Sequence, residues 1–137
     1  MVALVLPVTV PAQTSQLVDR LVAIVGGQPL TLTDLRFARG VGAIVVPETA
    51  DDVAAIAALV DRRLLVIETA RLPPREPAAD LIEAEVQRMR AHAGTGLSAL
   101  LRDTGYTERA LTDTARETLR IDAYLSQRYG AGTTRAS

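Results

Sequence analysis

The first patterned segment of the chain is a short apolar run, Leu21–Val25, followed by two glycines and then by alternating apolar and polar side chains over residues 29–32. An apolar run this short, with β-branched side chains, favours a buried strand, and Gly26 with Gly27 can supply the positive φ of a tight reversal. Thr33 and Asp34 then offer a hydroxyl N-cap and an acid for the first turn of a helix. The pattern predicts a β-hairpin that leads directly into a helix over about residues 34–43.

Helical spacing of apolar side chains begins again after Pro47. Thr49 can cap a helix that reaches about Arg71, with Asp51 and Asp52 in its positive first turn. Its apolar positions recur three and four residues apart, so they share one face and predict that this helix is the centre of the core. These positions are Val53, Ile56, Val60, Leu64 and Ile67.

Three more helices are expected in the C-terminal half. One runs from Pro77 to a stop at Gly94, a short one lies around residues 97–101 and ends at Gly105, and the last runs from a Thr107 cap to about Arg128. The apolar face of the first contains Leu81, Ile82, Val86, Met89 and Ala93, and that of the last contains Leu111, Ala115, Leu119, Ile121 and Leu125. As core residues we predict Leu64, Ile67, Leu119 and Leu125.

Composition agrees with one mainly α domain. A chain of 137 residues suits a single core, and with one Phe, three Tyr and no Trp this core must consist mainly of aliphatic side chains. The expected organisation is a leader over residues 1–16, a helical domain with an N-terminal β-hairpin over 17–129, and a disordered tail over 130–137. A net charge of −1 argues against nucleic acid as a partner, because such binding needs a positive surface.

The leader resembles the end of a secretory signal. Residues 1–10 are almost wholly apolar, and Val10, Pro11 and Ala12 resemble a cleavage site, although the positively charged start of a signal is missing. The segment is too short to span a membrane, so no transmembrane anchor is expected. A signal clipped at its start would mark the protein for export, and the alternative is a flexible apolar leader without that role. The absence of cysteine is compatible with an oxidising compartment.

The sequence lacks the residues that an enzymatic site would need. His92 is the only histidine, so a multi-histidine metal site is excluded within one chain, and we expect His92 to be a solvated helix residue. A triad of Ser98, His92 and Asp103 can be written down, but nothing marks Ser98 as a nucleophile. No glycine-rich phosphate-binding motif is present. The sequence therefore predicts no catalytic, cofactor-binding or metal-binding residues.

Charged pairs have structural interpretations. Asp51 with Asp52 is expected to serve a helix terminus, and Glu83 with Glu85 is too sparse for a carboxylate metal site. Arg62 and Arg63 can anchor acidic segments of a bound partner, but a solvated helix face is the preferred interpretation.

Three motifs resemble the N-terminal domain of the SurA-like periplasmic chaperones, which are related to parvulin-type peptidylprolyl isomerases. The first lies in residues 17–35, the second in residues 59–72, and the third comprises the segments 95–98, 105–107 and 119–125. The matching residues of the first are Val18, Asp19, Arg20, Ala23, Val25, Gly27, Pro29, Thr31, Asp34 and Leu35. Together the motifs cover about residues 17–129 in the order that the family shows.

The resemblance implies a non-catalytic chaperone-like module that holds unfolded outer-membrane or secreted proteins and needs no cofactor. Family members continue into a parvulin domain and a returning helical segment. This chain is expected to lack both, which would leave apolar surface on its core helices for a client or a second copy. Two alternatives stay open, namely a dedicated helical interaction or dimerisation domain and a truncated fragment of a parvulin-type isomerase. The residues that contact a client cannot be selected from the sequence.

Overall fold

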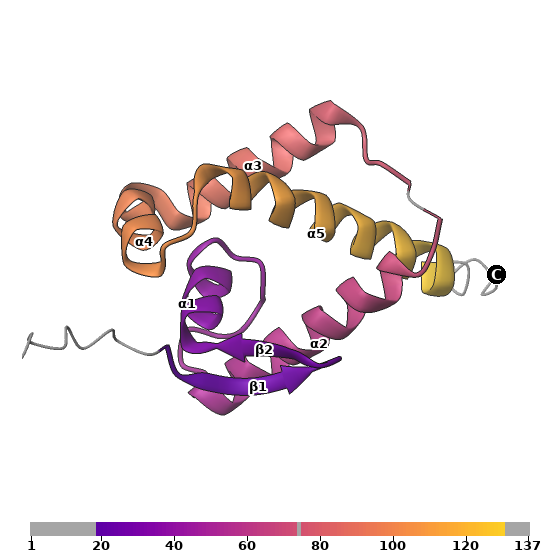
Figure 1. Ribbon diagram of the computed structural model, residues 1–137. Coiled ribbons are helices and arrows are strands. Elements are labelled where there is room, and N and C mark those ends of the chain that lie inside the picture. Colours follow the sequence, from indigo (N-terminus) through magenta and orange to yellow (C-terminus); the bar gives the residue numbers. More distant parts are fainter. Residues whose placement is uncertain (1–18, 74, 131–137) are drawn as a thin grey trace, which may run out of the picture.

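The computed structural model describes residues 19–73 and 75–130, which form two strands followed by five α-helices (Figure 1). The predicted fold class, mainly α with a short N-terminal β-hairpin, is confirmed. The expected leader over residues 1–16, and the expected tail beyond Gly130, lie outside the described residues.

The hairpin consists of β1 (Leu21–Val25) and β2 (Gln28–Thr31), which pair antiparallel. Gly26 and Gly27 connect them with φ values of 58° and 77°, the left-handed conformation that the two glycines were expected to supply. The pairing register of the two strands shifts between Leu21 and Ala23. One face of the hairpin is buried through Val25 and Leu30, so the opposite face is left towards solvent.

Helix α1 (Leu32–Gly40) begins one residue after β2, with Thr31 as its N-cap. The Thr31 hydroxyl accepts a hydrogen bond from the Asp34 amide at 3.3 Å, and the Asp34 carboxylate accepts one from the Thr31 amide at 2.8 Å. The prediction of Thr33 as the cap was therefore wrong. Thr31 leaves the strand in the extended conformation that a cap requires, and its three-residue spacing to Asp34 permits the reciprocal pair.

Helix α1 is also the centre of the core, because two hydrophobic clusters meet on it. Leu35 and Ala38 belong to a cluster formed with the hairpin and helix α2, whereas Phe37 and Val41 belong to a cluster formed with the C-terminal helices. The expectation that α2 is the centre was wrong.

Helix α2 (Asp52–Ala70) is capped by Asp51, whose carboxylate accepts a hydrogen bond from the Ala54 amide at 2.9 Å, and not by Thr49. Its fully buried residues are Ala55 and Leu59. Leu64, predicted in the core, is 52% exposed, because the hairpin and α1 cover the side of α2 that is centred on Ala55 and Leu59. Ile67 is half-buried against the same cluster.

The C-terminal half contains α3 (Ala79–Ala93), a 3₁₀ turn η1 (Gly94–Gly96), α4 (Leu97–Thr104) and α5 (Glu108–Tyr129). Gly94 and Gly105 end α3 and α4 as predicted, whereas Pro77 lies before α3, whose N-cap is Ala78. Thr107 holds the N-cap position of α5 without a side-chain hydrogen bond.

Helix α5 packs along α3 and also contacts α2, so that α3 and α5 form a layer on one side of α1, opposite the hairpin and α2 (Figure 1). Its fully buried residues are Leu111, Ala115 and Ile121, whereas Leu119 and Leu125, predicted in the core, are half-buried. Between α4 and α5, Tyr106 stacks on Phe37 with ring centroids 4.1 Å apart. This stack holds the layer to α1.

Candidate functional site

An open groove of about 470 Å³ lies where α2, α3 and α5 meet the connection between α1 and α2. We call it the interhelical groove. Its lining consists of Gly42, Ala43, Ile44, Val45, Ala58, Asp61, Arg62, Leu65, Glu85, Arg88, Thr118, Ile121 and Asp122. The volume falls within the range of about 300–1,000 Å³ that is usual for ligand sites.

The base of the interhelical groove is apolar. Ile44 and Ile121 are buried residues of the core, and Ala58 and Leu65 of α2 are half-buried. Val45, next to Ile44, is by contrast 94% exposed. The Val45 side chain is therefore accessible to a group bound in the groove.

Arg62 of α2 lines the groove, and residues of α5 orient its side chain. Its guanidinium donates hydrogen bonds to the Thr114 carbonyl at 3.3 Å and to the Glu117 carboxylate at 3.5 Å. The Arg62 side chain is only 13% exposed, and its burial lowers the pKa of its guanidinium. For the Glu117 carboxyl, burial has the reverse effect and raises the pKa, and the positive charge of Arg62 offsets only part of this rise. The preferred interpretation of Arg62 as part of a solvated face was therefore wrong.

On α3, Arg88 and Glu85 form a closed pair. The Arg88 Nε donates to both oxygens of Glu85, at 3.1 and 2.9 Å, and this hydrogen bonding raises the pKa of Arg88. Both arginines of the groove are thus occupied by carboxylates of the protein.

Two further carboxylates line the groove from different helices, Asp61 from α2 and Asp122 from α5. Both are exposed, and neither makes a hydrogen bond or ion pair with another described residue. Asp122 acts on Arg62 and Arg88 only through space: its charge opposes the lowering of the Arg62 pKa by burial, and it adds to the raised pKa of Arg88, which is caused chiefly by the hydrogen bonds to Glu85.

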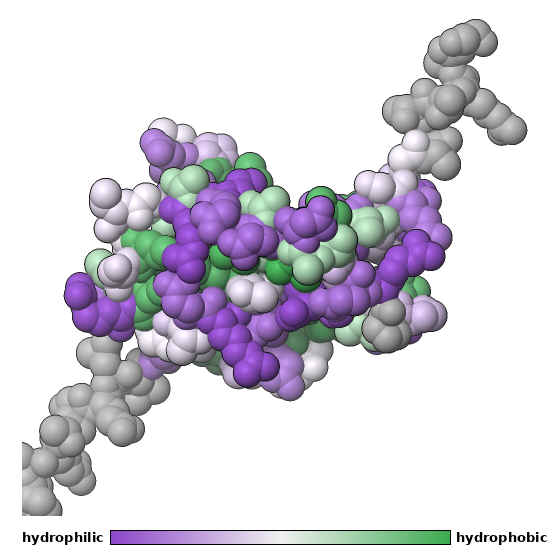
Figure 2. Space-filling model, turned by 90° about the horizontal axis from the view of Figure 1, so that it is seen from above, coloured by the Kyte–Doolittle hydropathy of each residue, from purple (hydrophilic) through white to green (hydrophobic). Residues whose placement is uncertain are grey.

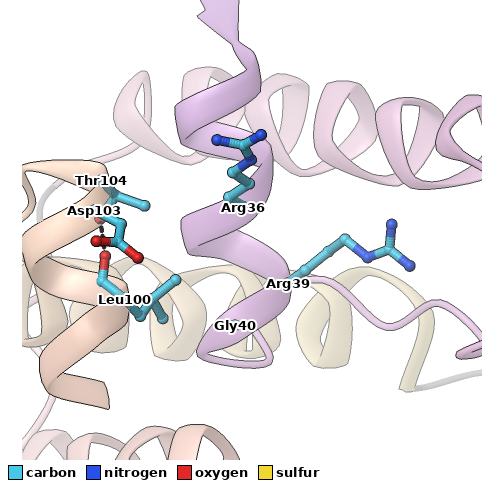
Figure 3. Close-up of a pocket in the computed structure, with 6 residues that line it drawn as sticks. All are labelled: Arg36, Arg39, Gly40, Leu100, Asp103 and Thr104. Carbon is cyan, nitrogen blue, oxygen red and sulfur yellow. Dashed lines mark hydrogen bonds between the residues drawn. The ribbon is translucent and has the colours of Figure 1, made fainter. Parts of the chain in front are cut away.

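A second pocket, of about 500 Å³, lies between α1 and α4 (Figure 3). Leu100 points from α4 towards Gly40 of α1, while Arg39 extends away from α4 and pairs with Asp52 at 3.6 Å. Asp103, also in the lining, pairs with Arg102 at 3.6 Å. Three of the six residues that line this pocket, Arg36, Arg39 and Asp103, are charged.

Apolar side chains are also exposed outside the groove. Ile24 on the outer face of the hairpin is 67% exposed, Leu21 is exposed near it, and Val53 of α2 is 73% exposed. The face over α3 and α5 is instead covered mainly by hydrophilic side chains, with hydrophobic ones visible between them (Figure 2). Exposed apolar residues are thus prominent on the hairpin and α2.

The residues considered from sequence for catalysis do not form a site. His92 is exposed in the last turn of α3, as predicted, and no hydrogen bond joins it to Ser98 or Asp103 of α4. Asp51 and Asp52 lie at the start of α2, as expected. Glu83 accepts a hydrogen bond from Gln87 at 2.9 Å.

The interhelical groove itself was not identified from sequence. Its one local signal is Val45, an apolar residue in a connection between helices. Asp61 and Asp122 look like ordinary solvated helix residues, because they meet only through packing of helices distant in sequence.

Within the described residues, no group of three or more His, Asp or Glu side chains is arranged to hold a metal ion. Nor is any helix there long and apolar enough to span a membrane. Comparison with protein-family models, with curated proteins and with solved structures found no match to this chain.

Proposed function

We propose that this protein is a non-catalytic, chaperone-like module that binds apolar segments of unfolded polypeptides in the interhelical groove. The observation that carries the proposal is the apolar base of the groove next to Val45, which is 94% exposed. An apolar residue at the edge of an apolar depression gains burial only when a partner covers it.

A polypeptide suits this groove better than a compact small molecule. The groove is open to solvent and lacks the enclosed shape that buries most of a small ligand. Apolar side chains at Leu21 and Ile24 extend the exposed apolar surface beyond it. In the described part of the chain, the sheet has two strands, so each strand has an edge to which an extended segment can add. Such contacts are tolerant of sequence, as binding of unfolded chains requires.

The resemblance in sequence to SurA-like chaperones supplies the client class and the compartment. We therefore assign outer-membrane proteins in transit through the periplasm as the clients. No cofactor is needed, because burial of apolar surface provides the binding free energy.

The test is light scattering during dilution of an unfolded outer-membrane β-barrel protein from urea, with and without a molar excess of the full chain. We expect suppressed aggregation. Unchanged aggregation, with circular dichroism showing the protein folded, would overturn the proposal.

A matched pair of variants locates the activity. Val45→Asp places a charge beside the apolar base, whereas Val53→Asp makes the same change at another exposed position, 73% exposed on α2. Suppression should be reduced in Val45→Asp and retained in Val53→Asp. Equal losses would assign the effect to general surface hydrophobicity and not to the groove.

A dimerisation domain is the second candidate, favoured by the exposed Leu21 and Ile24 on the outer face of the hairpin. A second copy could cover this face in a symmetric interface. Sedimentation velocity over a range of concentrations decides between the candidates, because a mass that stays monomeric rejects dimerisation.

A further inference from the structure

The charges of the interhelical groove define its ligand more closely than its apolar base does. Three carboxylates line it, from Asp61, Glu85 and Asp122, together with two guanidiniums, from Arg62 and Arg88. What matters for a ligand is which of these charges the protein has already paired.

Both guanidiniums are engaged within the protein. Arg62 donates to the Thr114 carbonyl and to Glu117, which is not part of the groove lining. Arg88 is held by both oxygens of Glu85. Each guanidinium keeps further N–H donors, but its charge is already balanced by a carboxylate of the protein, so an acidic ligand gains less from it than from an unpaired arginine.

Asp61 and Asp122 are in the opposite situation. Each lines the groove, each is exposed, and neither has a hydrogen-bond or ion-pair partner among the described residues. They come from different helices, α2 and α5, so two separate elements each supply the groove with an acid. The lining also contains apolar side chains, among them Ile44, Leu65 and Ile121.

We propose that the interhelical groove selects polypeptide segments in which a lysine or arginine lies beside an apolar side chain. This inference rests on the proposed function and specifies the client that the same groove accepts. The aliphatic part of a basic side chain packs on the apolar base while its charged end reaches Asp61 or Asp122. An acidic segment is repelled by the same two carboxylates.

Three peptides of equal length test the charge preference. The probe is fluorescein-labelled Gly-Ser-Leu-Lys-Leu-Lys-Leu-Ser-Gly, and its two relatives carry glutamine or glutamate in place of both lysines. Fluorescence anisotropy with the full chain at low salt measures each Kd. Each exposed ion pair increases the affinity only by a small factor. We therefore expect the lysine peptide to bind about fivefold more tightly than the glutamine peptide, and the glutamate peptide to bind most weakly of the three. Added salt should reduce the difference.

Two double variants with the same change in net charge locate the effect. Asp61→Asn with Asp122→Asn removes the two free acids of the groove. Asp80→Asn with Asp103→Asn removes two exposed acids of α3 and α4 that do not line it. The preference for lysine over glutamine should fall to about onefold in the first variant and stay at about fivefold in the second.

The outcomes separate this inference from the proposed function. Suppressed client aggregation with equal affinity for all three peptides would keep the chaperone function and overturn the charge selection. A lysine preference that falls equally in both double variants would also overturn it, since net charge alone would then explain the preference. Binding of none of the peptides, without suppression of aggregation, would overturn both proposals.

Discussion

Tyr106 donates a hydrogen bond from its hydroxyl to the carboxylate of Asp34, a residue 72 positions earlier in the chain. The same carboxylate accepts the Thr31 amide at the start of α1, so the acid that completes the helix cap also holds the connection between α4 and α5. Burial, followed by this hydrogen bond, raises the pKa of Tyr106 above its ordinary value. One carboxylate thus joins the hairpin, α1 and the C-terminal helices.

Replacing Tyr106 with Phe should lower the free energy of unfolding by about 1–2 kcal/mol, since a hydrogen bond to a charged acceptor is lost while the ring can still stack on Phe37. Urea denaturation followed by circular dichroism measures the change. Tyr129→Phe, at an exposed position, should stay within about 0.5 kcal/mol of the unmodified chain. Equal effects of the two substitutions would contradict a structural role for the Tyr106 hydroxyl.

Gly40→Ala should destabilise the protein although alanine is the better helix former. A Cβ at Gly40 would overlap both terminal methyl groups of Leu100 and lie 3.2 Å from its Cγ, so either the Leu100 side chain must leave its rotamer or α1 and α4 must move apart. We expect a net loss of about 1 kcal/mol, because overpacking outweighs the gain in helix propensity. Thermal unfolding provides the measurement.

Two controls accompany Gly40→Ala. Gly96→Ala should be tolerated, because nothing lies within 4 Å of the added Cβ. In a Leu100→Ala background, where the obstruction is gone, Gly40→Ala should instead stabilise by about 0.5–1 kcal/mol. A stabilising effect in the unmodified chain would show that Leu100 moves aside.

Glu76 joins the connection before α3 to the middle of α5, where it accepts hydrogen bonds from Arg116 at 2.7 Å and Arg120 at 2.8 Å. These interactions lower the pKa of Glu76. A carboxyl whose pKa is lower in the folded state adds stability above its unfolded pKa of about 4.3 and loses it as the pH falls.

Glu76→Gln should therefore melt at a lower temperature than the unmodified chain at pH 7, with the difference vanishing as the pH falls below about 4. Thermal unfolding across this pH range at low salt tests it. Glu48→Gln, at an exposed position without an ion pair among the described residues, should show no such pH-dependent difference. A difference for Glu76→Gln that is unchanged at low pH would argue against the ion pairs as its source.

Arg62→Ala should cost about 1–3 kcal/mol, because it removes packing between α2 and α5 and leaves Glu117 with its raised pKa and no partner. The double variant Arg62→Met with Glu117→Met should be nearly neutral, since apolar side chains avoid the desolvation of both charges. Urea denaturation of Arg62→Met, Glu117→Met and the double variant gives the coupling free energy. An additive loss in the double variant would mean that the two side chains act independently.

The ends of α3 and α4 could be predicted from sequence because their determinants are local. Gly94 and Gly105 stop a helix wherever it lies. The hairpin is similar, since Gly26 and Gly27 carry the turn. The cap of α1 was assigned to Thr33, although the reciprocal spacing of Thr31 and Asp34 was visible in the sequence.

The buried face of α2 could not be predicted in the same way. Helix α2 carries apolar side chains on several of its sides. Only the positions of the hairpin and α1 decide that Leu59 is buried while Leu64 is half exposed. The groove presents the same difficulty. Arg62 finds its acceptors more than fifty residues later in the chain, and no local pattern indicates that Asp61 and Asp122 line one depression.

Helix α1 is nine residues long, and it contributes some side chains to one hydrophobic cluster and others to the second. A fragment that ends after α2 would expose Phe37 and Val41, and a fragment that begins at α3 would lack them. Neither half of the protein is thus a self-sufficient folding unit, and the described domain is expected to fold and unfold as one cooperative whole.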